Sequence, residues 1–224
     1  MQGVKFGEYH SYEDFGLILT KKTIGTPTPK TQIIEVPGAD GEIDLTEYLG
    51  EVKYSNRPLN FEFEIIKKQT DFVSLFSRIQ NCLHGLRKPI ILDIDNEFYY
   101  IGRITVNEWQ SNKNIGKIVI DVDAEPYKYK LNKTVFSVVI GESKQATINL
   151  RNLKKAVTPE ITISAETTIK YNYDIASGVY QNSDALSAST WTLPELLLTE
   201  GDNIITLEAE KGTVITFTYQ EGEL

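Results

Sequence analysis

Carboxylates are the only abundant side chains in this sequence whose types and spacing could do chemistry. The chain holds 31 Asp and Glu against 23 Lys and Arg, and it has only two His and one Cys. The segment VPGADGEIDLTEYLG places four of the acids within fifteen residues. A calcium loop of the EF-hand type needs Asp at alternating positions before its glycine and a Glu further on. Only Asp40 closely precedes Gly41 here, so we predict no metal site in this segment.

Turn chemistry explains the same segment better. Val36-Pro37-Gly38-Ala39 fits a type II turn, with Pro at the second position and Gly at the third, where φ must be positive. Asp40-Gly41 is the strongest signal for a two-residue hairpin turn, and the residues from Glu42 to Leu45 then alternate between polar and apolar. We therefore predict a hairpin with the start of a strand after it.

Other combinations of reactive residues do not converge on a site. Asp121, Asp123 and Glu125 share one face of a predicted strand, and carboxylates spaced along a strand diverge. A hydrolase needs two carboxyls about 5–10 Å apart across a cleft, which makes this the weakest of three functional hypotheses. Cys82 and His84 are two residues apart on a predicted helix and point to different sides, so we expect Cys82 to be structural. The sequence predicts no catalytic residues, cofactor or metal, and no enzyme.

Composition narrows the class of protein. The net charge of -8 argues against a nucleic-acid binder, which needs a basic face. The N-terminus lacks a basic start followed by an apolar run, and no stretch approaches the roughly 18 apolar residues of a membrane span. A single cysteine allows no disulfide within the chain. We expect a protein that folds in a reducing cytosol.

The first part of the chain is predicted to be an α+β domain, residues 1–132. LNFEFEI alternates as a half-buried strand, and KPIILDIDNEFYYIGRITVNEW is typical of a hairpin or meander that turns at Asp95-Asn96. GKIVIDVDAEPY is a further strand closed by Pro126. Residues of about 70–85 form one amphipathic helix, whose apolar stripe consists of Phe72, Leu75, Phe76, Ile79 and Leu83. Such a helix should cover one face of a β-sandwich or barrel-like sheet.

The second part, residues 133–224, is predicted to be an all-β sandwich of jelly-roll type. It shows no helical stripe and many short strands separated by turn residues. Its aromatic residues suggest a second functional hypothesis, a carbohydrate-binding module attached to a structural domain. The candidate platform for sugar rings consists of Tyr171, Tyr173, Tyr180 and Trp191.

The order of several segments resembles the distal tail protein (Dit) family of long-tailed phages (siphophages) and prophages, especially those of Gram-positive hosts. The segments are GVKFGEYHSYEDFGLIL, VPGADGEIDLTEYLG, YSNRPLNFEFEI, LHGLRKPIILDIDNEFYYIGRI, DVDAEPYKY, INLRNLKKAVTPEITI and LLLTEGDNIITLEAEKGTVITFTYQEGEL. Each is a turn or strand pattern, and together they cover nearly the whole chain in the family's order.

The resemblance implies a structural virion component at the tail tip, folded in the cytoplasm of the bacterial host before assembly. Members of the family form a homohexameric ring with their first domains, and a galectin-like or carbohydrate-module-like second domain projects outward. The ring joins the tail tube protein to the tail-associated lysin or spike, and in some phages it carries receptor-binding proteins. By this resemblance, the predicted hairpin is an interface with a neighbouring subunit or the tube. Its candidate residues are Val36, Pro37, Gly38, Asp40, Gly41 and Asp44.

Overall fold

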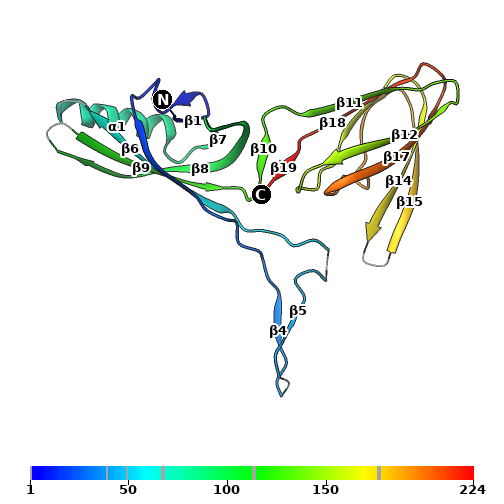
Figure 1. Cartoon of the computed structure of the whole chain (residues 1–224), viewed down its shortest axis with the longest axis horizontal. Helices are drawn as coiled ribbons and strands as arrows, with labels where there is room; N and C mark the ends of the chain where they lie inside the picture. Colours follow the sequence, from blue (N-terminus) through cyan, green and yellow to red (C-terminus); the bar gives the residue numbers. More distant parts are fainter. Residues whose placement is uncertain (1, 39, 49, 67–68, 113–114, 176–177) are drawn as a thin grey trace. The chain divides into compact units, whose positions relative to one another are not determined.

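The computed structural model describes residues 2–38, 40–48, 50–66, 69–112, 115–175 and 178–224 of the chain (Figure 1). The chain divides into two compact units. The first comprises Met1–Lys30, Lys53–Leu131 and Leu224, and the second comprises Thr31–Val52 and Asn132–Glu223. The sequence predicts a boundary at residue 132, and residues 31–52 group here with the later part of the chain. The prediction of a mainly β protein is confirmed.

An antiparallel sheet with the order β2-β1-β7-β8-β9-β6-β3 forms the first unit, and β10 pairs with the start of β8. The strands are β1 (Val4–Phe6), β2 (Tyr9–His10), β3 (Ile18–Ile24), β6 (Arg57–Ile66), β7 (Arg87–Leu92), β8 (Asp95–Ser111), β9 (Ile115–Ala124) and β10 (Lys128–Lys130). The predicted alternation of β6 is confirmed, because Leu59, Phe61, Phe63 and Ile65 are all buried.

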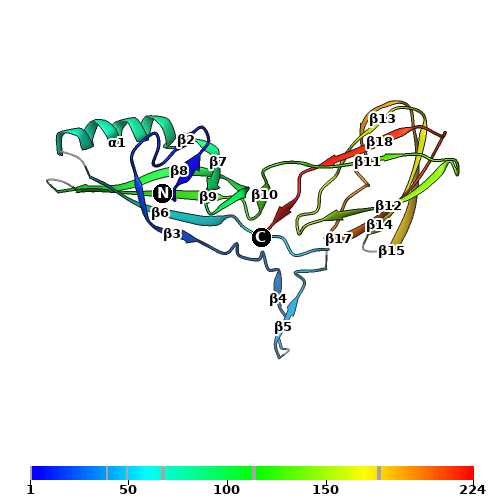
Figure 2. The same cartoon turned by 45° about the horizontal axis from the view of Figure 1, so that its top comes forward.

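Helix α1 (Gln69–Leu83) is the single α-helix among the described residues, and it lies over one face of the sheet (Figure 2). The predicted stripe faces the core: Phe72, Leu75, Ile79 and Leu83 are buried, and Phe76 is partly buried against them. Each such side chain contributes about 1.5–3 kcal/mol on burial, which fixes the helix to the sheet. Cys82 is partly buried at the edge of the same core.

The hairpin between β7 and β8 turns two residues earlier than the sequence suggested. Leu92 pairs with Asp95, so the turn consists of Asp93 and Ile94 and not of Asp95-Asn96. The physical reason is burial, because Ile90 and Leu92 both face the core and the strand must continue to Leu92. The Asp93 carboxylate then accepts a hydrogen bond of 2.6 Å from the Gly3 amide.

The second unit contains a sandwich of two four-stranded antiparallel sheets, ordered β11-β18-β13-β16 and β12-β17-β14-β15. The strands are β11 (Thr134–Val139), β12 (Gln145–Asn152), β13 (Glu160–Ile163), β14 (Thr167–Ile175), β15 (Gly178–Leu186), β16 (Ser189–Thr192), β17 (Gly201–Ala209) and β18 (Val214–Tyr219), with the short β19 (Gly222–Glu223) at the end. Both sheets contribute to one core, for example through Ile169 and Leu207 on one and Ile161 and Phe217 on the other.

Residues 31–52 contain a separate two-stranded hairpin of β4 (Ile33–Glu35) and β5 (Glu42–Asp44) (Figure 1). We call residues 31–52 the arm. In the first unit, the chain segments on either side of it are tied together, because Pro29 bridges to Tyr54 and the Lys30 amide donates to the Lys53 carbonyl oxygen. The predicted hairpin is therefore present, and the two chain segments that enter and leave the arm are hydrogen-bonded to each other.

Candidate functional site

The connection at the tip of the arm runs from Val36 to Gly41. Six residues thus join β4 to β5, so the two-residue turn predicted at Asp40-Gly41 is wrong. Two glycines explain the wider connection, because Gly38 has φ of 85° and Gly41 has φ of 81°. The value at Gly38 is the one that the third residue of a type II turn requires. Ala39 lies outside the described residues.

Apolar side chains of the arm are exposed to an unusual degree. Ile34 and Ile43 are direct cross-strand partners, with exposed fractions of 44% and 50%. Tyr48, beyond β5, is 74% exposed, and Ile33 and Val36 are exposed as well. An isolated two-stranded hairpin is only marginally stable in water. An arm with this composition is therefore suited to contact a partner.

The opposite face of the arm carries three carboxylates beside Ile33. Glu35 pairs directly with Glu42 across the two strands, and Asp44 pairs with Ile33. Like charges directly opposite each other in a sheet are destabilising. Asp44 has a local role, because its carboxylate accepts a 2.9 Å hydrogen bond from the Thr46 amide, and the hydrogen bonds from Thr46 lower the pKa of Asp44. Asp44 thus holds the turn that follows β5.

The six predicted interface residues accordingly lie together in one exposed element. Val36, Pro37, Gly38, Asp40 and Gly41 form its tip, and Asp44 ends β5. The sequence argument missed Ile34, Ile43 and the Glu35–Glu42 pair. The signal that could have found them is the run Ile33-Ile34-Glu35-Val36, which sits next to turn residues and outside the longer alternating strands.

The carboxylates of β9, and that of Glu125 just after it, are held by neighbouring side chains and do not form a site. The carboxylate of Asp121 accepts hydrogen bonds from the side-chain amides of Asn60 (2.7 Å) and Asn107 (2.8 Å). Glu125 pairs with Arg87 and accepts the hydroxyl of Tyr129. Burial, together with this acidic neighbour, raises the pKa of Tyr129. Among the described residues, no group of three His, Cys, Asp or Glu could hold a metal ion.

The candidate sugar platform is not assembled by the described residues. Tyr171 is only 2% exposed, and its hydroxyl lies 3.0 Å from the Asp184 carboxylate and 3.0 Å from the Asn182 amide nitrogen. Trp191 packs against the core of the second unit and donates its indole N–H to the Ser187 carbonyl oxygen. Tyr180 is exposed, whereas the side chain of Tyr173 lies outside the described residues. A buried Tyr171 offers no ring face to a sugar.

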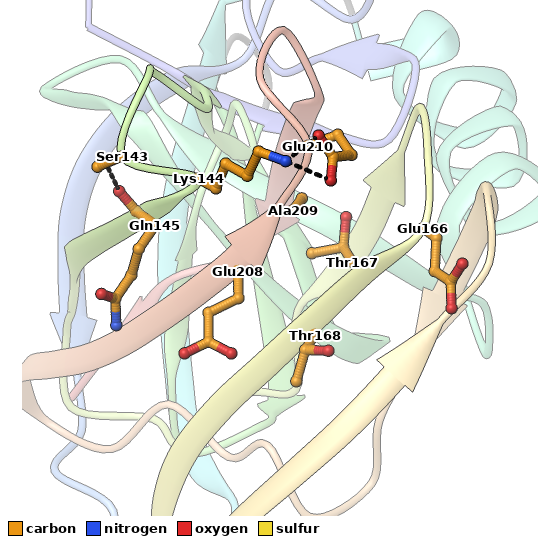
Figure 3. A pocket seen from close by; sticks show the side chains of 9 residues that line it. All are labelled: Ser143, Lys144, Gln145, Glu166, Thr167, Thr168, Glu208, Ala209 and Glu210. Atoms are coloured by element: carbon orange, nitrogen blue, oxygen red, sulfur yellow. Dashed lines mark hydrogen bonds and ion pairs between the residues drawn. The ribbon is translucent and has the colours of Figure 1, made fainter.

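An open polar hollow of about 500 Å³ lies at one end of the second unit (Figure 3). It is lined by Ser143, Lys144, Gln145, Glu166, Thr167, Thr168, Glu208, Ala209 and Glu210. Lys144 forms an ion pair with Glu210, and Glu208 pairs with Lys170. The lining therefore consists mainly of hydroxyls and carboxylates. Two of the carboxylates, those of Glu208 and Glu210, are already paired with lysines.

Comparison with solved structures adds a strong likeness. No protein-family model matches the chain, and no curated protein matches it. The crystal structure of the SPP1 Dit protein (gp 19.1), presented as a paradigm of the hub adsorption apparatus in phages that infect Gram-positive bacteria, matches with a TM-score of 0.70. The likeness covers 100% of both chains at 16% sequence identity. The chain thus has the fold of that protein, as the resemblance in the sequence predicted. No helix of the described residues is long and apolar enough to cross a membrane.

Proposed function

We propose that this protein is a structural component of a phage tail tip that assembles into a closed ring and acts as a hub. The observation that carries the proposal is the likeness to the SPP1 Dit protein over the full length of both chains. The homohexameric ring, the tail tube on one side and the lysin or spike on the other belong to the same proposal, as do receptor-binding proteins. We infer these partners from the family that the sequence resembles.

The exposed arm supports a ring of identical subunits. A head-to-tail contact uses two different surfaces of each subunit, and it closes into a ring when the rotation between neighbours allows it. The arm offers one such surface, because Ile34 and Ile43 are exposed side by side. We propose that the arm contacts a neighbouring subunit, with its tip residues Val36 to Gly41 at the contact.

Mass measurement and electron microscopy test the ring. We expect native mass spectrometry or light scattering to show a closed oligomer, alone or together with the tail tube protein and the lysin or spike. We also expect negative-stain images of the same sample to show rings. A protein that stays monomeric at high concentration with all of these partners present would refute the proposal.

A deletion tests the role of the arm. Removal of Gly38 to Gly41 shortens an exposed tip without touching either core, so we expect normal unfolding of both units and loss of ring assembly. Replacement of the same four residues by four glycines is the control for the length of the connection. A deletion variant that unfolds outright, or one that still forms normal rings, would contradict this role.

A further inference from the structure

The outer face of the first unit, which is the sheet face not covered by α1, has two chemically different parts. Over β9 and β6 it is polar, with Asp121 held by amides and an ion pair of 3.3 Å between Lys117 and Glu64. Over β7 and β8 it becomes apolar and forms an open hollow of about 420 Å³. The hollow is lined by Arg87, Lys88, Pro89, Ile91, Tyr99, Ile101 and Leu131. An exposed apolar patch beside a polar face is typical of a contact surface.

Two of the residues that line this hollow are cations. The Arg87 side chain is 52% exposed and binds Glu125, and the Lys88 ammonium binds Glu8 at 3.0 Å. A guanidinium carries five N–H donors in a planar fork, so Arg87 can hold a second carboxylate while it keeps Glu125. The surface therefore suits a partner that combines apolar side chains with carboxylates.

The arm has this combination of side chains. Ile34 and Ile43 form an apolar cross-strand pair, and Glu35 faces Glu42 on the other side of the same hairpin. The two carboxylates repel each other in the free arm, and a cation brought by a partner relieves that repulsion. The long arginine and lysine side chains at the hollow can reach around the edge of a narrow two-stranded arm.

We propose that the hollow between β7 and β8 receives the arm of a second copy of this chain. Ile34 and Ile43 pack on Pro89, Ile91 and Ile101, and Arg87 binds the Glu35–Glu42 pair. This inference rests on the proposed ring, and it assigns the surface that each arm binds. The contact joins two different surfaces of the same chain, as a closed ring requires.

Cysteine cross-linking between copies tests the assignment. Copies with Ile43→Cys are mixed with copies that carry Pro89→Cys, both in a Cys82→Ala background, and are then mildly oxidised under assembly conditions. We expect a disulfide-linked dimer from this mixture. Val73→Cys, at an exposed position on α1, replaces Pro89→Cys in the control and should give none. Rings that form normally but show no link at Pro89, or equal linking at Val73, would overturn the inference and leave the proposed function intact. Absence of any assembly would overturn both.

Charge reversal gives an independent readout. Arg87→Glu should weaken subunit association at least about tenfold, which corresponds to about 1.4 kcal/mol. The second change Glu42→Arg should restore most of it. Lys117→Glu is the matched control, because Lys117 is also a paired cation of the outer face but lies far along β9 from the hollow. Equal weakening by Arg87→Glu and Lys117→Glu, without rescue by Glu42→Arg, would contradict the proposed contact.

Discussion

Arg57 is a buried cation at the start of β6, close to where the chain returns from the arm. It is 7% exposed, and its guanidinium donates to the carbonyl oxygens of Gly25 (2.8 Å) and Pro126 (3.2 Å). Its Cζ atom also lies 5.4 Å from the centre of the Tyr100 ring. One side chain thus ties the end of β3, the start of β6 and the end of β9 together. We predict that Arg57→Ala destabilises the first unit by about 2–4 kcal/mol.

The magnitude follows from the contacts that are lost. Each hydrogen bond from a charged group contributes about 1.5–3 kcal/mol, and a cation over an aromatic ring about 0.5–2 kcal/mol. Part of this loss of stability is recovered in the variant, because the buried guanidinium no longer has to be desolvated. Arg57→Lys keeps the charge but cannot bridge two carbonyl oxygens in the geometry of the fork, so we expect about half the loss.

The two tryptophans make the assay specific for one unit. Trp109 packs against Phe72 and Phe76 in the first unit, and Trp191 packs in the second. In a Trp191→Phe background, tryptophan fluorescence in a urea titration therefore reports unfolding of the first unit. Arg78→Ala is the matched control, because Arg78 is exposed and lies 5.5 Å from the Phe15 ring centre. If Arg57→Ala lowers the free energy of unfolding no more than Arg78→Ala does, the role assigned to Arg57 is wrong.

Three further predictions concern local features. Burial, with the nearby Asp184 carboxylate, raises the pKa of Tyr171 to about 12. The stability that the protonated Tyr171 hydroxyl contributes is therefore complete below about pH 10 and is lost as the pH rises to about 12. Tyr171→Phe should reduce this loss in urea titrations of the second unit. A Cβ on Gly116 would lie 2.8 Å from the Phe72 ring, so Gly116→Ala should destabilise the first unit by about 1–3 kcal/mol in thermal unfolding, whereas an unchanged melting temperature would show that Phe72 moves freely. Hydrogen bonds from Thr46 lower the pKa of Asp44, so the turn after β5 should lose its order as pH falls through this lowered pKa; an NMR titration in which Asp44 behaves as a free Asp would contradict this.

Elements with a strong local period were predictable from the sequence. The stripe from Phe72 to Leu83 and the alternation of β6 each placed their apolar side chains correctly in the core. In both, the burial pattern repeats at the period of the secondary structure, so neighbouring residues are enough to define it. The likeness to a known fold was also visible in the order of the segments.

Features that depend on register were not predictable. The sequence alone does not show that Glu35 lies opposite Glu42, because the length of the connection decides the pairing. Asp40-Gly41 indicated a two-residue turn, but Gly38 also needs a positive φ and extends the connection. The residues next to Tyr171 in the sequence fit either an exposed or a buried face of a strand. Only the packing of the two sheets of the second unit shows that Tyr171 lies in the core.

The Glu35–Glu42 pair also has a consequence for free copies of the chain, before the assembly that we propose. Free copies present identical arms with exposed isoleucines and open strand edges, which favour pairing of one arm with another. Such a pairing would bring four carboxylates together, and their repulsion disfavours it. Screening weakens this repulsion, because the Debye length falls from about 10 Å at 0.1 M salt to about 3 Å at 1 M. High salt concentration should therefore favour aggregation of free copies through their arms.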